Sequence, residues 1–219
     1  MCDERLWQFT QQSIDESLTF LHVPIPMENS IQGILDALVT TLPDEPVNLL
    51  GFSMGGYIAC AFAAKYPERI KRLMVLSNTA SGLLDTERQQ REVALNWVSK
   101  QGYHGIPKKK AVAMLGSSYK DRDDLLDIIF SMDKALGEAV FIQQLKSSLE
   151  RPELLPELKS VSFALRFIVG GDDVLLSKDL VSEMQLSKAF DIKTLGGCGH
   201  MLPLEQPREL AALIEDFYH

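Results

Sequence analysis

A serine between a strand-like segment and a helix-like segment constrains this chain more than any other feature. Val47–Gly51 is an apolar run typical of a buried strand, and residues 54–64 continue as an alanine-rich helical pattern. Between them lies Gly51-Phe52-Ser53-Met54-Gly55, a G-x-S-x-G sequence in the strand–turn–helix context that this motif requires. Small residues two positions either side of the serine let strand and helix approach each other. We therefore expect a sharp, strained turn that lifts the Ser53 hydroxyl above the sheet edge.

The start of the helix that follows favours negative charge. The first N–H groups of a helix have no partner inside it, and the helix dipole is positive at this end. An anion formed beside Ser53 would be stabilised there, and we expect the Met54 amide to donate to it. The alternative, a glycine-rich turn that merely contains a serine, leaves the flanking strand and helix unexplained.

A serine hydroxyl is a weak nucleophile, so this interpretation requires a base and an orienting acid further along the chain. The chain has histidines at positions 22, 104, 200 and 219. His200 follows the strand-like run Asp191–Leu195 on a glycine-rich loop that leads into a helix at about Gln206. The other three lie in an apolar stretch, between helical segments and at the C-terminus. We therefore expect His200 to be the base.

The acid is expected after the preceding strand. Leu165–Val169 has the pattern of a buried strand, and it ends in Gly170-Gly171-Asp172-Asp173. Asp173 is the better candidate because it lies in the loop proper, where its carboxylate can reach the Nδ1–H of His200. Asp172 is the alternative, since loops tolerate a shift of one residue.

Strand-like and helical segments alternate along the chain. The expected strands are Thr19–Val23, Val47–Gly51, Leu73–Ser77, Leu165–Val169 and Ile192–Leu195, and Ile31–Thr40 is an expected helix. This alternation predicts an α/β fold, with a mostly parallel sheet flanked by helices. Ligands bind such sheets at the carboxyl ends of the strands, where Ser53, Asp173 and His200 all fall.

The strand pattern is absent between about Ser81 and Pro156. The helices expected there are Glu87–Lys100, Lys109–Leu115, Arg122–Phe130 and Lys134–Leu149. Apolar side chains from this insertion are candidates to line an acyl or alcohol pocket, among them Met114, Phe130 and Phe141. Helix packing alone would also require most of them. No pair of arginines suited to a dicarboxylate is evident, which favours a small, largely apolar ligand.

Taken together, these motifs resemble the α/β-hydrolase fold superfamily, in its esterase and enol-lactonase-like branch. The similar segments are Gly-Phe-Ser-Met-Gly-Gly at 51–56, residues 66–73, Gly-Gly-Asp-Asp at 170–173 and Gly-Cys-Gly-His-Met at 197–201. The resemblance covers essentially the whole chain. It implies a catalytic triad of Ser53, Asp173 and His200, with the Met54 amide in the oxyanion hole. It also implies a hydrolase core at 1–80 and 157–219 and a helical cap at 81–156.

The activity implied by the resemblance is hydrolysis of a small, largely apolar carboxylic ester or thioester through an acyl-enzyme. Such chemistry needs neither a metal nor an organic cofactor, and the expected partner is the small-molecule ester itself. An acyltransferase or lyase on the same scaffold is an alternative. A catalytically impaired member that binds a ligand is another.

The N-terminus departs from the family's pattern. Family members begin with two or three strands, the last ending in a His-Gly or Pro-Gly turn that completes the oxyanion hole. Residues 1–8 resemble the segment just after that turn, so we expect the second donor to fall before Met1. Either the start is set at an internal methionine or the protein is a shortened variant. Missing strands would expose a sheet edge and favour a homo-oligomer.

Composition narrows the remaining classes. A chain of 219 residues with 46% apolar content can bury a substantial core. Its formal net charge of −8 argues against nucleic-acid binding, because phosphates would be repelled. No apolar run approaches the roughly 18 residues of a membrane span, and no signal-peptide segment is evident, so a cytoplasmic location is expected. The three cysteines, Cys2, Cys60 and Cys198, have neither metal-ligand spacing nor a disulfide pattern.

Overall fold

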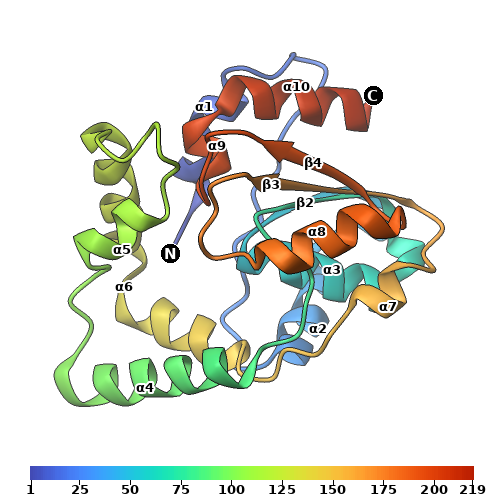
Figure 1. Ribbon diagram of the computed structural model, residues 1–219. Helices are drawn as coiled ribbons and strands as arrows, with labels where there is room; N and C mark the ends of the chain where they lie inside the picture. The colour runs from blue at the N-terminus through green and yellow to red at the C-terminus, as the bar shows by residue number, and fades with distance from the viewer.

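Four parallel strands form the central sheet of the computed structural model, which describes all of residues 1–219 (Figure 1). The strands are β1 (Val47–Phe52), β2 (Ile70–Leu76), β3 (Ala164–Gly170) and β4 (Asp191–Leu195). Their order is β1-β2-β3-β4, so β1 and β4 are the edge strands. The register pairs Phe52 with Leu76 and Leu76 with Ile168, so the loops that follow these strands lie together at the carboxyl ends of the strands.

Helices cover both faces of the sheet. On one face lie α2 (Ile31–Thr41), α3 (Met54–Lys65), α7 (Leu155–Leu158) and α8 (Lys178–Ser187). On the other lie α9 (Leu202–Glu205) and α10 (Pro207–Tyr218), with α1 (Gln8–Gln11) against α10. Two short 3₁₀ helices, η1 (Glu4–Trp7) and η2 (Pro67–Arg69), complete these layers. No helix is both long enough and apolar enough to cross a membrane.

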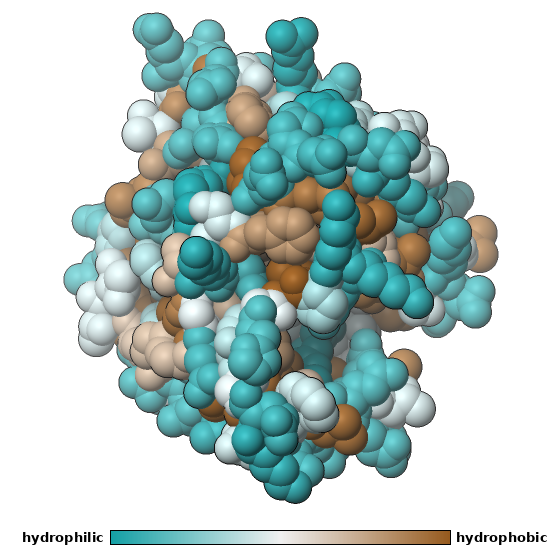
Figure 2. Space-filling view, turned by 90° about the vertical axis from the view of Figure 1, so that its left-hand side faces the viewer, coloured by the Kyte–Doolittle hydropathy of each residue, from teal (hydrophilic) through white to brown (hydrophobic).

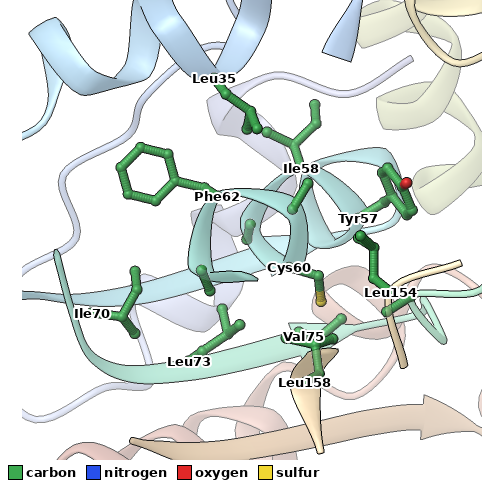
Figure 3. Close-up of a cluster of buried hydrophobic side chains, with 14 of the residues drawn as sticks. Leu35, Tyr57, Ile58, Cys60, Phe62, Ile70, Leu73, Val75, Leu154 and Leu158 are labelled. Carbon is green, nitrogen blue, oxygen red and sulfur yellow. The ribbon is translucent and has the colours of Figure 1, made fainter. Parts of the chain in front are cut away.

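Helix α3 lies at the centre of the larger core. It is buried continuously from Gly56 to Ala63, because the sheet covers one side and α2 and α7 cover others. Its alanines leave room for these neighbours to approach. Figure 3 shows Ile58 directed toward Leu35 of α2 and Cys60 toward Val75 of β2. This packing fixes the start of α3, and therefore Ser53, relative to the sheet.

Residues 81–156, which we call the helical segment, contain no strand, as the sequence predicts. Its helices are α4 (Asp85–Gln101), α5 (Lys108–Ala113) and α6 (Asp123–Ser147). Two separate helices are predicted in this region, but in the structure they form one helix, α6. Gly137, with φ 70°, kinks it. In Figure 1, α4, α5 and α6 lie beside and below the sheet, and α5 and α6 share a separate apolar cluster with η1. Whether this segment acts as a cap stays a prediction.

One predicted strand is wrong. Thr19–Val23 forms no ladder and is irregular, whereas the other four strands are found within three residues of their predicted bounds. Its apolar residues pack through side chains instead, and Phe20 meets Trp7 edge to face with ring centroids 5.9 Å apart. Leu21 is 79% exposed, so the run is not an inserted buried strand. Its apolar pattern reflects tertiary packing rather than strand pairing.

Candidate active site

Ser53 occupies a strained turn between β1 and α3. Its backbone has φ 50° and ψ −117°, a region that non-glycine residues rarely adopt. The Ser53 N–H donates to the carbonyl of Leu76 on β2 at 2.8 Å, and its carbonyl accepts from Tyr57 in α3 at 3.1 Å. A Cβ at Gly51 would lie 2.7 Å from the Cα of Gly56, so the motif needs glycine there. Sheet and helix together hold the strained serine.

The three predicted side chains lie in one hydrogen-bonded row. His200 Nε2 is 3.0 Å from Ser53 Oγ, and His200 Nδ1 is 2.8 Å from Asp173 Oδ2. His200 and Asp173 are only 4% and 3% exposed. With the proton on Nδ1 donated to the carboxylate, Nε2 is free to accept the serine proton. The arrangement is chemically able to activate the hydroxyl of Ser53.

The two candidate acids have different partners. Asp173 Oδ1 also accepts from the Leu175 N–H at 2.9 Å, which orients its carboxylate toward His200. Asp172 turns away and accepts from Ser117 N–H at 2.9 Å and Ser117 Oγ at 2.6 Å. These bonds lower the pKa of Asp172. Asp172 therefore ties its loop to the helical segment and does not meet the histidine.

The backbone of His200 is held from both sides. Its N–H donates to the carbonyl of Met114 at 2.7 Å, and its carbonyl accepts from Ser77 Oγ at 2.7 Å. The Phe52 ring lies against the imidazole with centroids 5.2 Å apart. The position of His200 thus depends on the strand ends and on the helical segment.

Glu205 is a site residue that sequence reasoning missed. Its carboxylate is 4% exposed and accepts three backbone N–H groups, from Gly116 at 2.7 Å, Gly199 at 2.9 Å and Met201 at 2.9 Å. Burial raises its pKa above the ordinary value, although the three bonds oppose this shift. Its bonds flank His200 on both sides, so it fixes the loop that carries the base. The only sequence signal was an acidic residue five positions after the histidine.

The sequence predicts an anion site at the first turn of α3. The N–H of Met54 lies at the start of this helix, directly after Ser53. Such groups have no partner within the helix, and the helix dipole adds positive potential there. Met54 is thus placed where the sequence predicts a donor to an oxyanion.

A cavity of about 1640 Å³ opens beside these groups, and Ser53, Met54 and His200 contribute to its wall. Of the predicted pocket residues, Met114 and Phe141 also line it. Phe130 is not among the lining residues; it packs with the apolar cluster of α5, α6 and η1. Figure 2 shows apolar side chains in the middle of one face, surrounded by hydrophilic ones.

Two further lining residues, Arg91 and Arg151, were not anticipated. Both belong to the helical segment, where no arginine pair was evident in the sequence. Arg91 lies in α4, and Arg151 follows α6 sixty positions later along the chain. The fold, not a local motif, brings both to the same cavity.

The cysteines are all free, and Cys60 and Cys198 are buried. Burial raises the pKa of both thiols well above its ordinary value. Cys198 thus stays a thiol although it lies two residues from His200. No three His, Cys, Asp or Glu side chains gather so as to hold a metal ion.

Comparison with known proteins gives sequence matches at low identity. A family model described as alpha/beta hydrolase fold matches residues 26–114. A 2-hydroxy-6-oxononadienedioate/2-hydroxy-6-oxononatrienedioate hydrolase of Escherichia coli is 25% identical over 84% of this chain and 66% of its own length. The biotin biosynthesis bifunctional protein BioHC of Teredinibacter turnerae is 22% identical over 98% of this chain and 42% of its own length. The chain thus spans less than two thirds of the length of these relatives.

Solved structures agree more closely in shape than in sequence. A thermophilic esterase from Thermogutta terrifontis has a TM-score of 0.78 at 19% identity, covering 98% of this chain and 85% of the esterase. A carboxylesterase structure from Nitrososphaera gargenis has a TM-score of 0.76 at 16% identity, covering 99% and 85%. Likeness at this identity concerns the fold. Together with the strand–Ser53–helix turn on a parallel sheet, these structures and the family model show that the chain has the α/β-hydrolase fold.

Proposed function

We propose that this chain is a serine hydrolase that cleaves a carboxylic ester or thioester through an acyl-enzyme on Ser53. The observation that carries the proposal is the hydrogen-bonded row from Asp173 through His200 to Ser53, which ends at the wall of a large cavity. The names of the relatives, which are hydrolases and esterases, support the same reaction class. The apolar side chains of Met54, Met114 and Phe141 on the cavity wall favour a substrate with an apolar portion.

In the first step, Ser53 Oγ attacks the carbonyl carbon while His200 Nε2 takes the hydroxyl proton. Asp173 holds the imidazole in the required tautomer and stabilises the imidazolium that forms. The Met54 N–H donates to the oxyanion at the positive end of α3. Collapse of the intermediate expels the alcohol or thiol, which receives the proton from His200, and leaves the acyl group on Ser53.

In the second step, water hydrolyses the acyl-enzyme with the help of the same groups. His200 takes a proton from water, the resulting hydroxide attacks the acyl carbon, and Ser53 leaves with the proton returned by His200. The products are a carboxylic acid and the free enzyme. In this proposal the helical segment acts as a cap that forms one wall of the cavity and selects the substrate.

A fluorophosphonate probe followed by peptide mass spectrometry tests the nucleophile. A single adduct on Ser53 is expected, with none in Ser53→Ala. Absence of an adduct on the folded wild-type protein at high probe concentration would overturn the proposal.

The neighbouring aspartates offer a matched test of the acid. Asp173→Asn should lower the turnover of a 4-nitrophenyl ester by up to about 10⁴-fold, by analogy with the equivalent change in a serine protease. Asp172→Asn should lower it by less than about tenfold, because Asp172 contacts Ser117 and not His200. Equal losses in the two variants would contradict the assigned roles.

A further inference from the structure

Arg91 and Arg151 line the same cavity as Ser53 and His200, yet neither has an acidic partner. No carboxylate oxygen lies within 4.0 Å of either guanidinium. Other basic side chains of this chain, among them Arg5, Arg122 and Arg166, do have an acidic partner within that distance. Both side chains are partly buried. Partly buried arginines facing a cavity are ordinarily paired with an anion, because the desolvated charge otherwise costs free energy.

Much of the donor capacity of the two guanidinium groups is unused. Arg91 donates only through Nη1, to the carbonyl and the hydroxyl of Ser148. Arg151 donates only through Nε, to the Ser81 carbonyl at 2.9 Å. None of their remaining nitrogens is sealed from solvent without a partner. The free donors therefore remain accessible to a ligand.

Two acidic side chains that act on the arginines from beyond contact distance accept backbone N–H groups. Glu87 accepts from the Leu84 N–H at 3.2 Å, at the start of α4. Glu153 accepts from the N–H groups of Gly82 at 3.1 Å and Leu155 at 3.0 Å. Glu87 favours the charged form of both arginines and Glu153 that of Arg151, but neither carboxylate reaches a guanidinium within 4.0 Å.

The two positive charges also disfavour each other. Burial lowers the pKa of Arg91, and the charge of Arg151 lowers it further. Burial likewise lowers the pKa of Arg151. A bound anion would offset both effects, since an opposite charge favours the protonated form.

Arg151 is connected to the nucleophile through one helical turn. Its guanidinium lies over the Tyr57 ring, 4.5 Å from the centroid, and the Tyr57 hydroxyl donates to the Pro152 carbonyl at 2.8 Å. Tyr57 follows Ser53 by one turn of α3, which corresponds to about 6 Å along the helix axis. A ligand held by Arg151 is therefore anchored to the same helix that presents Ser53.

We propose that Arg91 and Arg151 form an anion subsite that binds a carboxylate carried by the substrate away from the scissile bond. Guanidinium groups suit this ligand because their planar donor pairs match the two oxygens of a carboxylate. The inference rests on the proposed function and narrows it to esters that have an apolar chain and an anionic end. It modifies the expectation of a small, largely apolar substrate.

Matched pairs of esters test the subsite. We would compare kcat/KM for methyl half-esters of straight-chain dicarboxylic acids with that for the dimethyl esters of the same acids, over a series of chain lengths. A second series places the carboxylate on the alcohol side of the scissile bond. It compares O-acetyl ω-hydroxy acids with the same compounds whose carboxylate is blocked as a methyl ester. The wild-type protein should prefer the charged member at one chain length by at least about tenfold. The arm in which this preference appears shows whether the carboxylate belongs to the acyl or the alcohol part.

Three arginine-to-methionine variants separate the subsite from general effects. Arg91→Met and Arg151→Met should reduce the preference to within about twofold of unity, because they lower kcat/KM for the charged esters more than for the neutral ones. Arg122→Met is the matched control, because Arg122 is exposed, paired with Asp124 at 2.6 Å and outside the cavity wall. If Arg151→Met fails to fold, Arg91→Gln provides the same comparison from α4.

A binding measurement distinguishes failure of the subsite from failure of the proposed reaction. Titration calorimetry of the free dicarboxylates should show binding that both arginine variants lose and Arg122→Met keeps. If no ester is turned over but this binding is present, the hydrolase proposal fails and the subsite stands. Three results would each overturn the subsite. They are equal kcat/KM for charged and neutral esters, a preference unchanged in both arginine variants, and dicarboxylate binding that does not depend on the arginines.

Discussion

Replacing Glu205 by alanine should destabilise the fold by about 3–5 kcal/mol. The change orphans three backbone N–H groups, those of Gly116, Gly199 and Met201, which the carboxylate now accepts. A buried donor left without a partner costs about 1–3 kcal/mol, so three give a sum of about 3–9 kcal/mol. Water entering the vacated space can satisfy some of these groups, which places the expected loss in the lower half of that range.

Urea unfolding followed by circular dichroism measures this loss directly. Glu209→Ala is the matched control, because Glu209 lies exposed on α10, four positions after Glu205 in the chain, and should change stability by less than about 0.5 kcal/mol. The rate of fluorophosphonate labelling at Ser53, measured well below the unfolding transition, should also fall in Glu205→Ala, because the loop that carries His200 loses its anchor. A destabilisation no greater than that of Glu209→Ala would refute the argument that the three bonds hold this loop.

Two further predictions concern the same loop. Because burial raises the pKa of Glu205, its folded form binds a proton more tightly than its unfolded form; this carboxyl therefore contributes stability at low pH that is lost as pH rises through the folded pKa. As pH rises above about 4.5, the wild type should therefore lose stability relative to Glu205→Gln. Urea titrations that give the same stability difference at every pH would contradict this. Gly116→Ala should cost more than about 2 kcal/mol in the same assay, because a Cβ would lie 2.7 Å from the Gly199 nitrogen and 2.8 Å from the Cys198 carbonyl carbon. Gly196→Ala, whose Cβ would meet nothing within 4 Å, is its control, and equal losses would refute the steric argument.

The parts of the fold that carry local signals were predictable from the sequence. The motif around Ser53 encodes its own strand, turn and helix, and the loops with Asp173 and His200 each follow a recognisable buried strand. A parallel sheet then brings such loops to one edge, so their proximity follows from topology. The same reasoning separated Asp173 from Asp172 by its place in the loop.

The residues that escaped prediction depend on contacts between distant segments. Glu205 looks like an ordinary acidic helix residue until Gly116, 89 positions earlier, presents its N–H. Arg91 and Arg151 resemble solvated charges, because sequence does not show which face of a helix borders a cavity. Thr19–Val23 failed as a strand for a related reason, because Phe20 packs against Trp7, a contact that a short apolar run does not reveal.

The contacts of His200 with the helical segment limit how this segment can be exchanged between proteins of this fold. Met114 supplies the carbonyl that receives the His200 N–H, and Gly116 shares Glu205 with the loop of the base. A graft that replaces residues 81–156 to change the cavity would also remove these supports. Any donor segment must therefore reproduce a carbonyl and a glycine at these two positions, or the transplanted pocket will come with a misplaced His200.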